Sequence, residues 1–146
     1  MSALEVMRGS ERFLTIDAAG RVTAFNGHVD LGTGIRTALA QIVAEELSIP
    51  FDRVEMVLGS TRTGPDQGAT IASETIQVSA IPLRQAAATA RAFLLGLAAE
   101  HLGVPTADLT VVDGVVQSTQ DRNLFVSYPA LLAGQSVRLD LDPHAP

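Results

Sequence analysis

Polar and apolar residues alternate over two neighbouring stretches near the start of the chain. Residues 12–16 and 21–25 each alternate, and residues 17–20 between them include a glycine that can adopt a positive φ in a turn. This pattern predicts a β-hairpin. The alternation resumes over residues 28–31, so we expect a further strand there after a bulge or bend at Gly27.

The hydrophobic period changes from two residues to 3.6 after residue 34. Apolar residues recur four, seven and eight positions after Ile35 and polar residues separate them, which predicts an amphipathic helix over residues 35–47. Thr33 or Gly34 stands where the N-cap belongs, and residues 48–50 end the helix. The next alternating run predicts a strand over residues 54–58.

A long stretch rich in glycine, threonine and serine follows over residues 59–72. A loop of that length inside a compact domain is usually functional or docked on a partner. The helical pattern then returns over residues 73–102, with many alanines in its second half. Pro82 interrupts it, so we expect either a kink or a new helix that opens there with Ser79 as its cap.

One short sequence pattern occurs twice in the chain. Residues 44–50 and the strand after them are matched by residues 99–105 and the strand after those, at an offset of 55 positions. Each copy contains a helix end, an X-Pro turn and a strand. We therefore expect two similar αβ units on one sheet.

The pattern in the last third of the chain predicts short strands and one short helix. Asp113 and Gly114 join two β-rich runs over residues 109–118, which is a strong signal for a two-residue hairpin. Ser127 is placed to cap a short helix that extends to residue 132. A last strand is expected over residues 137–141.

Together these elements predict an α+β fold. We expect a two-layer α/β sandwich in which two main helices pack against a mixed sheet, with β-hairpins. At 146 residues, with 47% hydrophobic and 18% charged residues, the chain can bury a proper core as one domain. We expect this domain over residues 12–141, a loose lead-in over residues 1–11 and a frayed end over residues 142–146.

Charge and composition limit the kinds of partner, compartment and cofactor that we expect for the chain. The formal net charge is −6 and the basic residues form no cluster, which argues against nucleic acid as a partner. No apolar run approaches the roughly 20 residues that a membrane span needs. Residues 1–9 lack the apolar core of a signal peptide, so we expect a cytoplasmic protein, with the periplasm as an alternative for a full assembly. Since the chain has no cysteine, it holds no disulfide or iron–sulfur cluster of its own.

The most informative short motif is Gly32-Thr33-Gly34, which connects the predicted strand over residues 28–31 to the predicted helix. Three backbone amides with little side-chain cover then point out of a helix start, which favours anions or electron-rich oxygens. The structural alternative is a tight strand-to-helix turn with a capping threonine. The motif alone leaves both interpretations open.

A series of motifs in one order distinguishes between them. After Gly32-Thr33-Gly34 come residues 37–47 of the predicted helix, residues 54–59 with the predicted strand, and residues 65–70 and 73–77. This series resembles the molybdopterin-binding subunit of the xanthine oxidase/aldehyde oxidase family, with the nearest likeness to the isoquinoline 1-oxidoreductase beta-subunit. The resemblance covers roughly residues 10–140 and implies a molybdenum cofactor-binding subdomain.

The resemblance implies that Gly32, Thr33 and Gly34 lie beside the molybdenum. Relatives often have a glutamine at the position of Thr33, where its amide hydrogen-bonds an oxo ligand of the metal. The shorter threonine hydroxyl could reach only through a water or a shifted backbone. We therefore assign cofactor binding to these three residues and assign no catalytic or metal-ligating residue.

The loop residues depart from the family in two places. Ser60 stands where an aspartate commonly follows the glycine, and Ala72 stands where relatives usually have glycine. We interpret the first position as structural and expect no very close backbone approach at the second. Asp66 and Gln67 are expected to be turn residues, with a place near a substrate funnel as the alternative.

Other polar residues have ordinary structural interpretations. His28 and Asp30 share one face of a strand, but no third ligand is placed beside them, so a polar surface pair is favoured over a metal site. Glu45 and Glu46 diverge by about 100° on a helix and cannot act together on one substrate. His101 is favoured as a cation at a helix C-terminus.

Hydrolase chemistry lacks support in the sequence. Ser60, Ser73 and Ser79 have no histidine and aspartate partners at a recognisable spacing. None of the three stands on a nucleophile elbow.

The resemblance implies hydroxylation of an aldehyde or an N-heterocycle with oxygen from water. That reaction needs a glutamate base and further cofactor-binding loops, which relatives carry in later parts of a much longer subunit, and iron–sulfur centres on a separate subunit or domain. We therefore expect a partial molybdopterin-binding module that is not competent alone and holds the molybdenum cofactor only when other chains complete the site. Its expected partners are the remaining molybdopterin-binding segment or subunit and an iron–sulfur subunit.

Two alternatives remain open from the sequence. The chain could be a non-catalytic binding or scaffolding module that kept the fold without the cofactor, or a small enzyme that uses the loop over residues 59–73. A partial module should expose an apolar face that the rest of the subunit normally covers, and a homo-oligomer could also form through that face.

Overall fold

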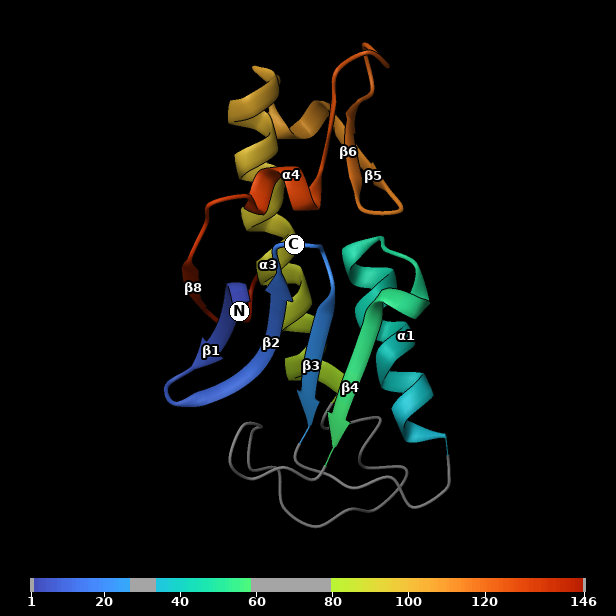
Figure 1. Ribbon diagram of the computed structural model, residues 1–146, viewed down its shortest axis with the longest axis vertical. Helices are drawn as coiled ribbons and strands as arrows, with labels where there is room; N and C mark the ends of the chain where they lie inside the picture. The colour runs from blue at the N-terminus through green and yellow to red at the C-terminus, as the bar shows by residue number, and fades with distance from the viewer. Residues whose placement is uncertain (1, 27–33, 59–79, 146) are drawn as a thin grey trace.

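The computed structural model of the chain describes residues 2–26, 34–58 and 80–145 (Figure 1). The predicted strand over residues 28–31 and the predicted loop over residues 59–72 therefore lie outside the described residues. No helix in the described part of the chain combines the length and the apolar character needed to cross a bilayer.

A five-stranded mixed sheet forms one layer. Its strands, in the order β4-β3-β2-β1-β8, are β4 (Val54–Leu58), β3 (Val22–Asn26), β2 (Glu11–Asp17), β1 (Ser2–Arg8) and β8 (Val137–Asp140). The central pairs β1–β2 and β2–β3 are antiparallel, whereas the outer pairs β3–β4 and β1–β8 are parallel. The predicted hairpin is confirmed as β2 and β3.

Two long helices form the other layer. The helices α1 (Ile35–Leu47) and α3 (Ala80–Leu102) contact each other and the sheet, and their buried side chains join those of alternate strand residues in one core. The strand residues of this core include Leu4, Val6, Leu14, Ile16, Val22 and Ala24. The predicted α+β sandwich is confirmed, as is the extent of α1. Pro82 lies in the first turn of α3 as described, where proline is tolerated, whereas residues 73–79 with the predicted cap Ser79 lie outside the described residues.

A second sheet of three strands lies beside the C-terminal half of α3 (Figure 1). It comprises β5 (Leu109–Val112), β6 (Val115–Ser118) and β7 (Phe125–Ser127), followed by the short helix α4 (Tyr128–Leu132). Asp113 and Gly114 both have positive φ, at 51° and 77°, as the predicted two-residue hairpin requires. The hydroxyl of Ser127 accepts a hydrogen bond from the amide of Ala130 at 3.2 Å, which confirms the predicted cap.

The two copies of the repeated sequence pattern have the same local structure. Ser48 and Gly103 end α1 and α3 with positive φ, and the amide of the following residue donates to the carbonyl of Ala44 or Ala99 at 3.0 and 3.1 Å. A 3-10 helix then follows each proline, η1 (Phe51–Arg53) and η3 (Thr106–Asp108).

The prediction that the two echoed units share one sheet is wrong. Strand β4 pairs with β3 in the large sheet, whereas β5 pairs with β6 in the small one. The reason is helix length, because α1 has 13 residues and α3 has 23. Ten additional residues extend a helix by about 15 Å, which delivers the second strand beyond the edge of the first sheet.

The expectations for both chain ends are also wrong. Ser2–Arg8 is not a loose lead-in but strand β1, which pairs with β2 on one side and β8 on the other. At the other end, the amide of Asp142 donates to the hydroxyl of Thr89 at 3.0 Å, and the side-chain amide of Gln85 donates to the carbonyl of Pro143 at 3.3 Å. These contacts tie the end of the chain to α3.

The turn of the β2–β3 hairpin docks on α4 through Gly20. This residue has φ 86°, and a Cβ added to it would lie 3.0 Å from Cγ of Pro129. We expect Gly20→Ala to destabilise the chain by about 2 kcal/mol, because it combines left-handed backbone strain with overpacking. Urea unfolding measures this change.

Gly9→Ala is the matched control for this variant. Gly9 has φ 62°, but a Cβ there would meet nothing within 4 Å, so only backbone strain is added. It should destabilise the chain by about 1 kcal/mol. Equal decreases in the free energy of unfolding for the two variants would show that the contact with Pro129 does not affect stability.

Candidate functional site

The ends of two strands and the starts of two helices meet at one end of the molecule. The parallel strands β3 and β4 run toward this end, and α1 and α3 both begin there (Figure 1). The described residues that flank the two undescribed segments, Asn26, Gly34, Leu58 and Ala80, therefore all lie at this end. In α/β sheets, ligands bind in the crevice outside the carboxyl ends of parallel strands, so this end is the candidate site.

The start of α1 is the described part of the predicted motif. Gly34 is the N-cap, with φ 77° and ψ 17°, and its carbonyl accepts the first helical hydrogen bond from Ala38 at 3.0 Å. The amides of residues 35–37 precede that bond, and the first turn contains no acidic side chain. Among the described residues, apart from its chain neighbours, none lies within 4 Å of a Cβ added to Gly34.

This helix start suits a negatively charged or oxygen-rich group. The amides and the positive end of the helix dipole both favour such a group. The start of α3 at the same end adds a second dipole of the same orientation. The site thus offers backbone donors on a rigid scaffold.

Arg36 belongs to this end as well. Its Nη1 donates to the carbonyl oxygen of Met56 in β4 at 2.7 Å, which fixes the first turn of α1 against the edge of the sheet. The side chain also lines a cavity of about 260 Å³ between α1 and β4. Sequence reasoning missed this role, because an arginine at a polar position of an amphipathic helix gives no signal for it.

Most of the residues singled out from the sequence lie outside the described residues. This holds for Gly32 and Thr33 of the motif, and also for His28, Asp30, Ser60, Asp66, Gln67, Ala72, Ser73 and Ser79. Of the three predicted cofactor-binding residues, only Gly34 is described. Glu45 and Glu46 lie in the last turns of α1, and His101 lies exposed in the last turn of α3, away from the candidate site.

Among the described residues, side chains that bind metal ions are not grouped together. Within residues 2–26, 34–58 and 80–145, no three His, Cys, Asp or Glu side chains are grouped so that they could hold a metal ion. What the described residues provide is a set of amides and an arginine. They fit the polar or anionic part of a group whose metal is held by other ligands.

Comparison with known proteins identifies the family of this chain. A family model for the molybdopterin cofactor-binding domain matches residues 3–141. A nicotinate dehydrogenase subunit from Pseudomonas putida is 54% identical over 134 residues, which is 92% of this chain and 11% of the relative. The chain therefore spans about a tenth of the length of this relative.

Two solved structures share the fold. A reconstituted CO dehydrogenase from Oligotropha carboxidovorans superposes with a TM-score of 0.73 and 29% identity, over 81% of this chain and 15% of that one. Quinoline 2-oxidoreductase from Pseudomonas putida 86 superposes with a TM-score of 0.70 and 26% identity, over 83% and 15%. The resemblance that the sequence motifs indicated is thereby confirmed at the level of the family.

Proposed function

Since this chain belongs to the molybdopterin cofactor-binding domain family, we propose that it forms part of the cofactor-binding wall of a larger molybdenum hydroxylase. The observation that carries this proposal is the glycine-capped start of α1 at the carboxyl ends of β3 and β4. Gly34 with the amides of residues 35–37 would hold a polar or anionic part of the cofactor, and Arg36 would keep this helix start in position. Gly32 and Thr33 are included in the proposed site on the strength of the sequence motif.

When bound, the cofactor supplies the metal that takes up two electrons from the substrate. The contribution of this chain is orientation, because its helix start and sheet edge are rigid and its donors are backbone groups. The base that removes a proton and the remaining ligands are assigned to the rest of the assembly. The chain alone is therefore proposed to be inactive.

The proposed substrate is an aromatic N-heterocycle. Two of the similar proteins are named for such compounds, nicotinate and quinoline, and the identity to the first is 54%. In the proposed overall reaction, a ring C–H and water give a ring C–OH, two protons and two electrons. The electrons would leave through an iron–sulfur subunit, and the rest of the molybdopterin-binding polypeptide would complete the site, within a cytoplasmic assembly.

The test uses the assembly that purifies with this chain. We expect the complex to contain molybdenum by elemental analysis and a pterin by fluorescence after cofactor release. Gly34→Ala should lower both contents roughly tenfold, because the alanine variant relaxes to a different helix start in the free chain and must pay about 1.4 kcal/mol to regain the left-handed conformation on cofactor binding.

Gly103→Ala is the matched control. Gly103 also has positive φ, at 68°, and a Cβ added there would meet no atom within 4 Å, but it lies at the opposite end of α3. Its molybdenum and pterin contents should equal those of the unaltered complex. An unaltered complex that holds neither molybdenum nor pterin would contradict the proposal and support the non-catalytic scaffold.

A further inference from the structure

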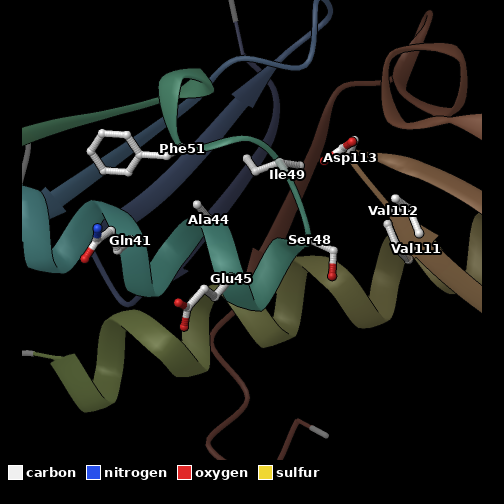
Figure 2. Close-up of a pocket in the computed structure, with 9 residues that line it drawn as sticks. All are labelled: Gln41, Ala44, Glu45, Ser48, Ile49, Phe51, Val111, Val112 and Asp113. Carbon is white, nitrogen blue, oxygen red and sulfur yellow. The ribbon is translucent and has the colours of Figure 1, made fainter.

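A groove lies on the side of the molecule away from the start of α1. It runs between the second half of α1, the residues that follow this helix and the β5–β6 hairpin, and has a volume of about 490 Å³ (Figure 2). Its floor is apolar, since Ala44, Ile49 and Val111 are each less than 9% exposed. The cofactor-binding proposal does not use this groove.

Two large apolar side chains border the groove and remain open to solvent. Phe51 is 47% exposed and Val112 is 61% exposed, and they come from η1 and β5. Among the described residues, only Ile81 and Phe125 join them as large apolar side chains with comparable exposure. An apolar floor between an exposed aromatic and an exposed aliphatic side chain is typical of a protein–protein contact.

The groove is acidic at its border. Glu45 and Asp113 line it, and no arginine is among the described residues that do so. Arg53 lines a neighbouring polar cavity with Asp52 and Glu55, and its Nη1 would lie 3.6 Å from a Cβ added to Gly114, so it offsets part of the charge of Asp113 but not that of Glu45. The groove therefore favours an occupant that presents a positive charge beside an apolar side chain.

Net charge argues against a second copy of this chain as the occupant. The chain carries a formal net charge of −6, so self-association would bring a negatively charged partner against Glu45 and Asp113. A partner with an exposed arginine or lysine beside an apolar residue avoids this repulsion. The homo-oligomer considered from the sequence is thus disfavoured at this groove.

Hydrogen bonds hold the two walls of the groove in place. The amide of Gly114 in the hairpin donates to the carbonyl of Ser48 at 2.8 Å, and the hydroxyl of Tyr128 donates to the carbonyl of Leu47 at 2.7 Å. The amide of Tyr128 in turn donates to the carbonyl of Gly114 at 2.9 Å. Because α1 and the hairpin are joined in this way, the groove exists before any partner binds, which reduces the entropic cost of binding.

We propose that this groove docks a segment of the remaining molybdopterin-binding polypeptide, with apolar side chains over Ala44 and Ile49, between Phe51 at one end and Val112 at the other (Figure 2), and with cationic side chains at Glu45 or Asp113. The inference rests on the proposed function, which supplies the partner. The chain spans 11% of the similar nicotinate dehydrogenase subunit, so a long polypeptide is available to provide this segment.

The first test measures assembly. Phe51→Asn should reduce the amount of remaining molybdopterin-binding polypeptide that co-purifies with this chain by about tenfold, since an apolar contact is lost and a neutral polar side chain replaces it. Phe125→Asn is the matched control, because Phe125 is 60% exposed but lies on β7 and does not line the groove. Equal recovery with the two variants would overturn the proposal.

The second test separates charge from packing. Glu45→Gln with Asp113→Asn leaves the apolar contacts in place, and asparagine tolerates the positive φ at position 113. This double variant should weaken assembly several-fold at low salt and have little effect at high salt. Glu100→Gln, at an exposed position of α3, should have no effect at either salt concentration. A loss that does not depend on salt would contradict the predicted cationic partner.

The third test identifies the occupant. A photo-crosslinking amino acid at position 112 in the assembled complex should link to a peptide of the remaining molybdopterin-binding polypeptide in which a basic residue neighbours an apolar one. Links to a second copy of this chain, to the iron–sulfur subunit or to no protein would each overturn the proposal. Molybdenum measured in the same samples keeps the two proposals apart, because a complex that retains the metal without this link refutes the groove alone.

Discussion

Replacement of Ala90 by leucine is expected to destabilise the chain by about 3 kcal/mol. Ala90 lies in α3 with 0% exposure, in the core that α3 forms with α1, β1 and β2. Alanine at this position allows the helix to approach its neighbours closely, so three additional carbon atoms force side chains or backbone to move. Urea unfolding followed by circular dichroism measures the change in the free energy of unfolding.

Ala92→Leu makes the same substitution half a turn away and serves as the control. Ala92 is an exposed residue of α3, and leucine is nearly as favourable as alanine within a helix. We expect a change within about 0.5 kcal/mol for this variant. Similar losses at both positions would show that α3 is not held by close alanine packing.

The alanine-rich composition of α3 predicts close packing, but not which alanines are buried. A helix that contacts one layer buries one stripe, whereas α3 also buries Ala88 and Thr89, which lie off the stripe through Ala86, Ala90 and Leu94. The reason is a contact distant in sequence, since the end of the chain packs on α3 at Thr89. No local pattern contains that contact.

The elements that could be predicted have strong local signals. The hairpin of β2 and β3 alternates cleanly, α1 has a clear period with a glycine at its start, and Asp113-Gly114 supplies a turn. Strand β1 was missed because Ala3, Leu4, Val6 and Met7 are all buried, and a strand covered on both faces does not alternate. Strand β7 has three residues, too few for a period to show.

The candidate site could be predicted only in part. The sequence indicates the start of α1 through its glycines, and the structure confirms Gly34 as the N-cap of this helix. The sequence does not indicate that Arg36 fixes this helix to Met56. Nor does it indicate that the amide of Gly114 in the hairpin bonds to Ser48 and so joins the two walls of a groove. Both contacts join residues that are well separated along the chain, so they follow from the arrangement of the layers.

Ionisation of Tyr128 is expected to destabilise the chain between pH 10 and 12. The side chain is 2% exposed and its hydroxyl donates to the carbonyl of Leu47. Burial raises the pKa of Tyr128 from 10.0 to about 12, partly opposed by the positive charge of Arg91. Above pH 10 the unfolded chain therefore loses this proton while the folded chain keeps it, so stability falls as pH rises.

The expected loss over this window is about 2–3 kcal/mol, at roughly 1.4 kcal/mol for each pH unit. The composition makes the measurement clean, because the chain has one tyrosine, no cysteine and no lysine. No other side chain with an ordinary pKa between 9 and 12 is then present. The free energy of unfolding at pH 9, 10, 11 and 12 gives the slope, and tyrosinate absorbance of the folded chain gives the pKa directly.

Tyr128→Phe separates the titration from the loss of the hydrogen bond. This variant should be less stable than the unaltered chain by about 1 kcal/mol at neutral pH, because the carbonyl of Leu47 loses its donor. Its stability should then change little between pH 10 and 12, so the two chains converge and the variant becomes the more stable one. Tyrosinate absorbance that rises near pH 10 while the chain is still folded would contradict this account, since a phenol that ionises at its ordinary pKa is neither buried nor held by Leu47. The same result would remove one of the two hydrogen bonds that fix the hairpin to the end of α1, and with it the argument that the groove is formed before its partner binds.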